Sequence, residues 1–97
     1  MLTGKQRRFL RAMGSGLDPI LQIGKGGVTD TVAQQLDEAL EARELVKVKV
    51  LNNCLMDVEE VADALEAMTG SYVAQKIGHN ILFYRRSEKK PQIELPG

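Results

Sequence analysis

Apolar residues along the chain follow two spacings, one typical of helices and the other typical of strands. Apolar residues three or four positions apart share one face of a helix, so this spacing predicts an amphipathic helix. Three segments show it, and each begins near a Thr or Asp that can cap a helix N-terminus. The predicted helices run from Thr3 to about Met13, from Thr29 or Asp30 through Leu40, and from Asp57 to about Gly70.

Four shorter segments have the pattern of strands. The clearest is 45–51, in which valines alternate with Lys47 and Lys49, so that one face is buried and the other faces solvent or a ligand. The other predicted strands are 20–23, 72–77 and 81–86, and the last two are joined by a short turn that favours a hairpin.

This order of elements, α-β-α-β-α-β-β, predicts the fold class. The first strand–helix–strand step should be a parallel crossover, and the last two strands should pair antiparallel. We therefore expect an α/β (α+β) two-layer sandwich with a four-stranded mixed sheet.

Length and composition limit the domain organisation and the compartment. A chain of 97 residues corresponds to one domain, which we place at residues 1–86. Residues 87–97 contain two prolines and four charges, so we expect a flexible tail there. No apolar stretch is long enough to span a bilayer, and a lone Cys54 cannot form an internal disulfide. We expect a cytoplasmic monomer with no membrane contact.

Charge is balanced overall but segregated along the chain. There are 13 basic and 13 acidic residues, yet residues 1–13 hold four basic residues and no acid, whereas residues 57–66 hold five acids and no base. Residues 30–45 are mainly acidic and residues 71–90 mainly basic. A folded domain could therefore present one basic and one acidic side, although such runs are also typical of ordinary solvated faces.

The glycine-rich turn Gly24-Lys25-Gly26-Gly27 lies between a predicted strand and a predicted helix N-terminus. Glycines allow a ligand to approach the backbone, and free amides at a helix start favour an anion such as phosphate. A tight turn that simply needs glycines is the competing interpretation. The spacing fits neither the Walker nor the dinucleotide pattern, which disfavours a nucleotide-dependent enzyme.

Residues suited to catalysis or metal binding are few. Cys54 and His79 are the only residues of their kinds, and the patterns place one in an apolar run and the other in a turn. We expect no enzymatic activity, no cofactor and no metal. Nucleic acid is then the best phosphate-bearing candidate, because Gly-x-x-Gly loops clamp RNA backbone in KH domains.

Several segments, in order, resemble one family. The opening Leu2–Arg11 segment, the Ile23–Thr29 glycine turn, the Glu44–Lys49 strand and the Leu82–Arg85 ending resemble the CRM (chloroplast RNA splicing and ribosome maturation) domain in its stand-alone, YhbY-like bacterial form. The resemblance implies a fold similar to the C-terminal domain of bacterial translation initiation factor three, with a KH-like loop. It also implies RNA binding without catalysis, on precursors of the large ribosomal subunit.

The residues expected to bind RNA are the four of the glycine turn, the basic residues of the first helix, and basic residues on two strands. They are Gly24, Lys25, Gly26, Gly27, Lys5, Arg7, Arg8, Arg11, Lys47, Lys49, Arg85 and Arg86. Phe9, Leu10 and Met13 should form the buried arc of the first helix, opposite its arginines. With only four aromatic residues in the chain, base stacking should contribute little.

Two functions therefore compete. The first is an RNA-binding protein that associates with large-subunit ribosomal RNA and assists ribosome assembly. The second is a protein-interaction adaptor that binds ribosomal proteins through the acidic sides of the second and third helices.

Overall fold

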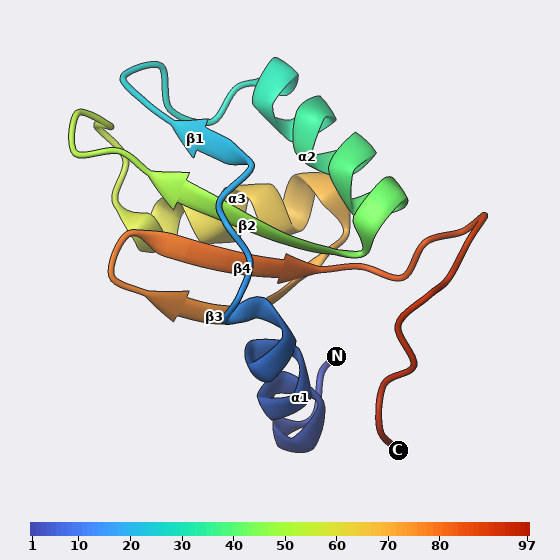
Figure 1. Ribbon diagram of the computed structural model, residues 1–97. Helices are drawn as coiled ribbons and strands as arrows, with labels where there is room; N and C mark the ends of the chain where they lie inside the picture. The colour runs from blue at the N-terminus through green and yellow to red at the C-terminus, as the bar shows by residue number, and fades with distance from the viewer.

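The computed structural model describes residues 1–97 and contains seven elements in the predicted order (Figure 1). The helices are α1 (Gly4–Gly14), α2 (Asp30–Arg43) and α3 (Val58–Thr69). The strands are β1 (Leu21–Ile23), β2 (Leu45–Val50), β3 (Tyr72–Ile77) and β4 (Asn80–Tyr84). None of the three helices has the length and apolar character needed to cross a bilayer.

Each helix begins at the capping residue that its sequence predicts. Thr3 and Asp57 form capping boxes. The cap side chain accepts the backbone N–H of the residue three positions on, and the side chain of that residue accepts the backbone N–H of the cap. Thr29 caps α2 by accepting the N–H of Val32. The helix α3 ends at Gly70, whose positive φ of 66° is the left-handed conformation that glycine adopts easily.

The strands form one mixed sheet in the order β1-β2-β4-β3. β1 lies parallel to β2, with Leu21 opposite Val48, and α2 connects the two strands. β4 is antiparallel to both of its neighbours, and its Tyr84 pairs with Leu45 on one side and Tyr72 on the other. The predicted four-stranded mixed sheet is therefore confirmed.

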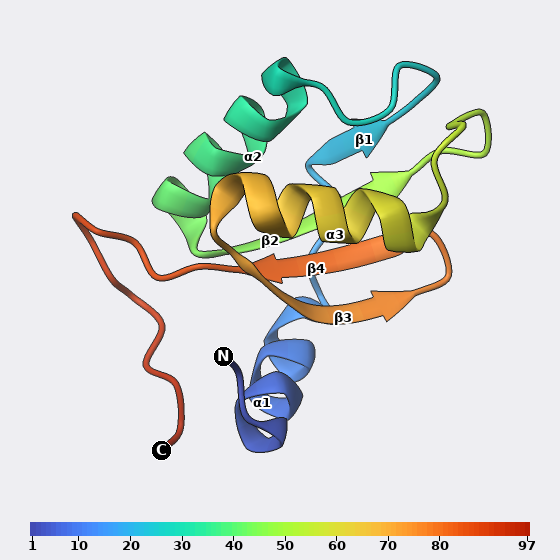
Figure 2. The ribbon, with the colours of Figure 1, turned by 180° about the vertical axis from the view of Figure 1, so that it is seen from behind.

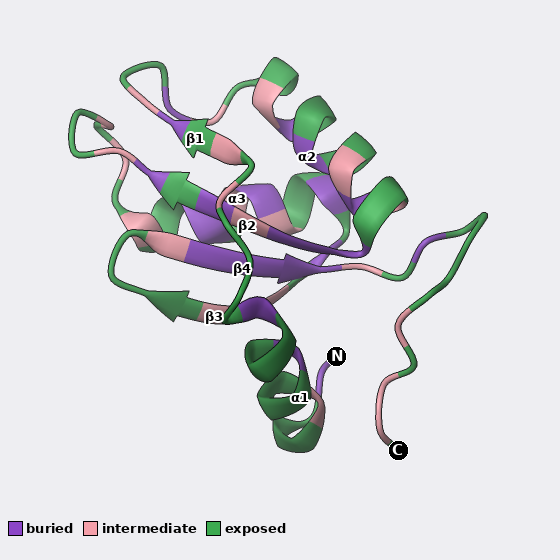
Figure 3. Ribbon diagram, in the orientation of Figure 1, coloured by how far each residue is buried: buried purple, intermediate pink, exposed green.

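The two faces of the sheet are covered unequally. Figure 2 shows α2 and α3 on one face, where they bury the larger core around Leu36, Leu65 and Phe83. On the other face α1 covers only part of the sheet, over a smaller core that includes Leu10 and Leu82. Most strand residues in these cores are buried, as Figure 3 shows. The sheet with α2 and α3 makes the two predicted layers, and α1 adds a partial third.

The buried face of α1 differs from the predicted arc. Leu10 is fully buried, but Phe9 and Met13 are 39% and 43% exposed. The second contact residue is Gly14, where an added Cβ would lie 2.5 Å from Cδ2 of Leu82. A glycine at this position lets α1 approach β4 closely, which turns the buried face away from Phe9 and Met13.

The segment 87–97, predicted to be a flexible tail, contains no helix or strand but is attached to the domain. Backbone amides of Ser87, Gln92 and Ile93 donate to the carboxylate of Glu44, over 2.6–2.8 Å. The amides of Glu88 and Lys89 donate to Glu41. The composition predicts a solvated segment, whereas five of its backbone amides donate to two carboxylates at the end of α2.

Candidate nucleic-acid interface

The glycine turn extends beyond β1 as a tight, solvent-exposed loop. The amide of Gly27 donates to the carbonyl of Gly24 over 3.0 Å, which closes the turn. Lys25 and Gly26 at its tip are exposed. Their two amides have no hydrogen-bond partner in the chain, so they remain available to an acceptor such as a phosphate oxygen.

The third glycine of the turn is required by the fold itself. Gly27 is buried and has a φ of +66°, and an added Cβ would lie 3.0 Å from the Sδ of Met56. The amide of Val28 also points at this sulfur, at 3.4 Å. At position 27 the interpretation as a structural turn is therefore sufficient.

Gly26 is different, because the fold does not require a glycine there. Its φ is not positive, and an added Cβ would meet nothing within 4 Å. At Gly24 an added Cβ would make ordinary contacts, the nearest 3.6 Å from Leu51. The open space above Gly26 is thus compatible with close approach of a ligand to the backbone.

The helix start next to the turn has its own acceptors. Thr29 takes the N–H of Val32, and Asp30 places a carboxylate in the first turn of α2. A negative charge here competes with an anion for the positive end of the helix dipole. The exposed amides at Lys25 and Gly26, together with the Lys25 ammonium, are consequently better placed for a phosphate than the helix terminus.

A second group of polar residues lies beside the turn and was not predicted. Asn52 and Asn53 follow β2 and are exposed, and Oδ1 of Asn53 would lie 3.7 Å from a Cβ at Gly24. Because β1 and β2 are parallel neighbours, the loops that follow them lie side by side at the carboxyl ends of the two strands. That rule, applied to the sequence, could have identified this pair.

The four basic residues of α1 are all exposed, and none forms an ion pair within the chain. No acidic residue occupies the first turn of α1. Four uncompensated cations on one short helix make it a strong electrostatic attractor for polyanions. They are Lys5, Arg7, Arg8 and Arg11.

Two lysines extend the basic surface onto the sheet. Lys47 and Lys49 alternate with valines that belong to the core under α2 and α3, so they share the opposite face with Leu45 and α1. Lys49 is exposed and Lys47 is half-buried. Neither forms an ion pair within the chain.

The glycine turn and α1 are not adjacent in space. Figure 1 shows α1 beside β3 and the turn beyond β1, and these strands form the two opposite edges of the sheet. The connecting segment 15–20 crosses the open face between them. Apart from Arg85, the predicted RNA-binding residues are therefore spread over a domain whose longest dimension is 38 Å, and they line no single pocket.

Arg85 is the predicted site residue that the structure places elsewhere. Its guanidinium pairs with Asp37 of α2 and donates to the carbonyl of Thr69, at 2.8 Å, at the end of α3. These bonds tie the two helices together on the face opposite α1. Arg86, one residue on, is exposed and forms no ion pair.

The carboxylates with perturbed acidity lie at the tail and not at the basic surface. Bonds from the Ser87 hydroxyl and from two tail amides lower the pKa of Glu41 to about 2. Burial raises the pKa of Glu44, but bonds from three tail amides together outweigh burial, so that this pKa is lowered. Both groups therefore hold the tail as carboxylates at neutral pH. No group of three or more His, Cys, Asp or Glu side chains is arranged to hold a metal ion.

Comparison with known proteins defines the class to which this fold and surface belong. The model of the CRS1 / YhbY (CRM) domain matches residues 2–85, and the chain belongs to this family. The Probable RNA-binding protein YqeI of Bacillus subtilis is 54% identical over 96 residues, covering 99% of this chain and all of the relative. An RNA-binding protein of Haemophilus influenzae is 34% identical over 95 residues, which cover 98% of this chain and 95% of the relative.

The fold has a counterpart among solved structures. The solution structure of the hypothetical protein SAV1595 from Staphylococcus aureus matches with a TM-score of 0.82 and 49% identity, over 99% of this chain and all of the other. A more distant relative, the chloroplastic group IIA intron splicing facilitator CRS1 of Arabidopsis thaliana, is 31% identical, and the match covers 14% of its length. The predicted family and fold are thus confirmed.

Proposed function

We propose that this protein binds RNA through the face that carries the glycine turn, Lys47, Lys49 and α1. The proposal rests on the glycine turn, where two backbone amides have no partner in the chain. Position 26 is a glycine although the fold does not require one there, so the backbone is open to close approach. Such a turn can clamp a phosphate of the RNA backbone, as Gly-x-x-Gly loops do. Lys25 supplies a positive charge at the same point.

The arginines of α1 act at a distance from this clamp. Because they lie across the sheet from the turn, they contact a different part of the RNA, and Lys49 lies on the face between them. Phosphate contacts of this kind supply most of the non-specific affinity for a nucleic acid. The arrangement favours an RNA with a defined shape over a short unstructured strand.

The RNA that we propose is large-subunit ribosomal RNA or its precursor, and the activity is assistance in assembly of that subunit without catalysis. The bacterial relatives that cover nearly the whole chain carry names of RNA-binding proteins, which supports RNA as the partner. Sedimentation of cell extracts tests the finer assignment. The protein should co-sediment with precursors of the large subunit, and equal recovery with both subunits would contradict it.

Salt dependence of RNA affinity tests the role of the turn. Lys25→Asp should weaken binding to a ribosomal RNA fragment and lower the slope of log affinity against log salt by about one unit, because one phosphate contact is lost. Lys90→Asp makes the same charge change in the exposed part of the tail and serves as a matched control. Equal affinities for the two variants would mean that Lys25 makes no contact.

The adaptor hypothesis is less well supported. Several acids on α2 and α3 already have partners within the chain, since Asp37 pairs with Arg85, Glu59 pairs with Lys76, and Glu41 binds the tail. Charge reversal at the exposed Glu38 and Asp63 tests what remains. Loss of a ribosomal protein partner while RNA binding persists would favour the adaptor.

A further inference from the structure

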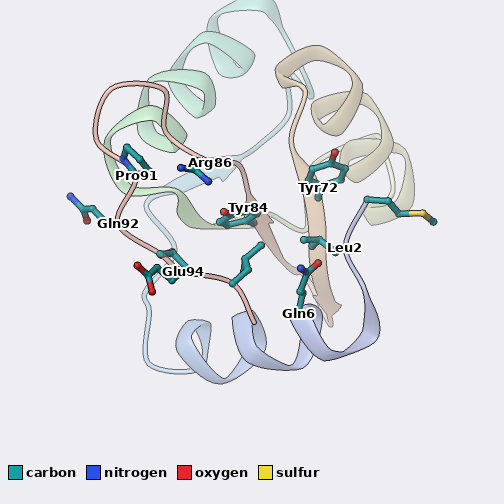
Figure 4. A pocket seen from close by; sticks show the side chains of 11 residues that line it. Leu2, Gln6, Tyr72, Tyr84, Arg86, Pro91, Gln92 and Glu94 are labelled. Atoms are coloured by element: carbon teal, nitrogen blue, oxygen red, sulfur yellow. The ribbon is translucent and has the colours of Figure 1, made fainter. Parts of the chain in front are cut away.

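A pocket of about 700 Å³ lies between the start of α1, the ends of β3 and β4, and the tail (Figure 4). This volume falls within the range of sites that bind small ligands. The pocket is separate from the glycine turn, which lies at the other edge of the sheet. Its lining combines apolar side chains with two tyrosines, two glutamines, an arginine and one carboxylate, that of Glu94. Figure 4 shows Glu94 on the tail, apart from Arg86.

The two tyrosines of the chain line this pocket together. Tyr72 and Tyr84 are directly opposite each other in adjacent strands and therefore lie on one face. Tyr84 is buried, while Tyr72 is 41% exposed and offers part of its ring to solvent. Burial, followed by the nearby Glu44 charge, raises the pKa of Tyr84, so its hydroxyl stays protonated and able to donate.

A free cation stands opposite Tyr72. Figure 4 shows Tyr84 in the middle of the pocket, with Tyr72 on one side of it and Arg86 on the other. Arg86 is exposed and makes no direct ion pair, and its charge helps to lower the pKa of the nearby Glu44. A partly exposed aromatic ring and a guanidinium that line one pocket are complementary to a nucleotide, because a base stacks on the ring and a phosphate accepts from the arginine.

The tail forms the remaining wall, and it is held in place. The amides of Gln92 and Ile93 donate to Glu44, and Ile93 packs against the smaller core together with Leu95. At the other end, the side-chain amide of Gln6 in α1 donates to the carbonyl of Pro96 over 3.1 Å. The pocket is thus open to solvent, and hydrogen bonds to Glu44 and to α1 hold its tail wall in place.

We propose that this pocket binds one unpaired nucleotide of the RNA, with its base against Tyr72 and its phosphate at Arg86. The inference rests on the proposed RNA binding and adds a second contact point to it. Gln6 places the start of α1, the helix with the free basic residues, at the wall of the pocket. Although aromatic residues are few, the fold gathers two of the four at this place.

Two RNA hairpins with an identical stem and loop test this proposal, one of them carrying a three-nucleotide unpaired 3′ extension. The wild type should bind the extended hairpin about tenfold more tightly, which is the typical effect of one stacked base. Tyr72→Ala should remove this preference and leave the affinity for the blunt hairpin unchanged. Tyr72→Phe, which keeps the ring, should retain the preference.

Circular dichroism establishes that each variant is folded. Should Tyr72→Ala unfold, Arg86→Gln replaces it, because Arg86 is exposed and lies outside the strands. Equal wild-type affinity for the two hairpins would overturn the nucleotide assignment, leave the proposed function standing, and favour a peptide as the occupant of the pocket. Absence of binding to either hairpin would overturn both proposals.

Discussion

The glycine turn and the tail both lack regular secondary structure, and they differ in what their backbone amides bond to. In the tail, five amides between residues 87 and 93 donate to the carboxylates of Glu41 and Glu44. In the turn, the amides of Lys25 and Gly26 have no partner. Backbone donors normally find acceptors, so exposed donors held in a fixed turn suit an acceptor from outside, whereas the tail already has its own.

Two consecutive glycines of the turn differ in whether the fold requires them. Gly27 has a positive φ and touches Met56, and Gly26 has neither constraint. One glycine serves the turn itself and the other leaves space above it. This distinction is the physical basis for separating effects on stability from effects on RNA binding.

The largest effect is expected from Glu44→Ala. Glu44 is 1% exposed and accepts three tail amides, so its loss leaves one buried donor, at Ser87, and two part-buried donors unsatisfied. We expect unfolding free energy to fall by about 3 kcal/mol, in the range for hydrogen bonds to charged groups. Chemical denaturation measures this, and Glu38→Ala in α2, the helix that Glu44 caps, is the control. A change as small as that of the control would mean that the tail is not held by Glu44.

A smaller loss of stability is expected from Gly27→Ala. The substitution forces a Cβ into a positive-φ position and toward the sulfur of Met56, which should cost about 2 kcal/mol. Gly26→Ala should change the unfolding free energy by less than about 0.5 kcal/mol, as is typical of surface substitutions. Thermal unfolding of both variants checks the difference. Equal losses would remove the distinction between the two glycines.

Neutralising α1 should affect RNA binding with little effect on the fold. Replacing Arg7, Arg8 and Arg11 by Gln removes three exposed, unpaired charges. The slope of log affinity against log salt should become shallower by about three units if each arginine contacts one phosphate, because each lost contact lowers the slope by about one. A filter-binding titration at several salt concentrations measures it. An unchanged slope would place the RNA away from α1.

The smallest effect is expected from acidification, which should release the tail before the core unfolds. The pKa of Glu41 is lowered from 4.5 to about 2 in the folded protein, and that of Glu44 is lowered as well. The stabilising contribution of Glu41 is therefore complete above pH 4.5 and is lost as pH falls toward about 2. Because the pKa of Glu44 is lowered too, its contribution is also lost on acidification. Amide hydrogen exchange at Ser87, Glu88 and Lys89 should accelerate in this window, corrected for intrinsic rates, while exchange at Val48 in the core stays slow. Uniform acceleration would contradict a separately released tail.

Local features of the fold were predictable from the sequence, and contacts between distant segments were not. Helix caps at Thr3 and Asp57 and the alternation around Lys47 and Lys49 depend on neighbouring residues, and the structure contains them as expected. The position of α1 depends on the approach of Gly14 to Leu82, 68 residues later, which a glycine ending a helix does not reveal.

The site followed the same rule. The basic helix and the glycine turn are close along the chain, yet α1 lies beside β3 and the turn follows β1, at the opposite edge of the sheet. Arg85 and Arg86 are adjacent and alike in sequence, but only Arg85 pairs with Asp37, which lies 48 residues away. The positions of partners in three dimensions decide which charges remain free.

The most direct test of the account compares Gly26→Ala with Gly16→Ala. Both glycines are exposed, and an added Cβ at either meets nothing within 4 Å, so both variants should keep the stability of the wild type. Affinity for a ribosomal RNA fragment, measured at fixed salt, should fall several-fold for Gly26→Ala and stay unchanged for Gly16→Ala. Equal affinities for the two variants would show that the turn does not clamp RNA backbone and would contradict the central claim.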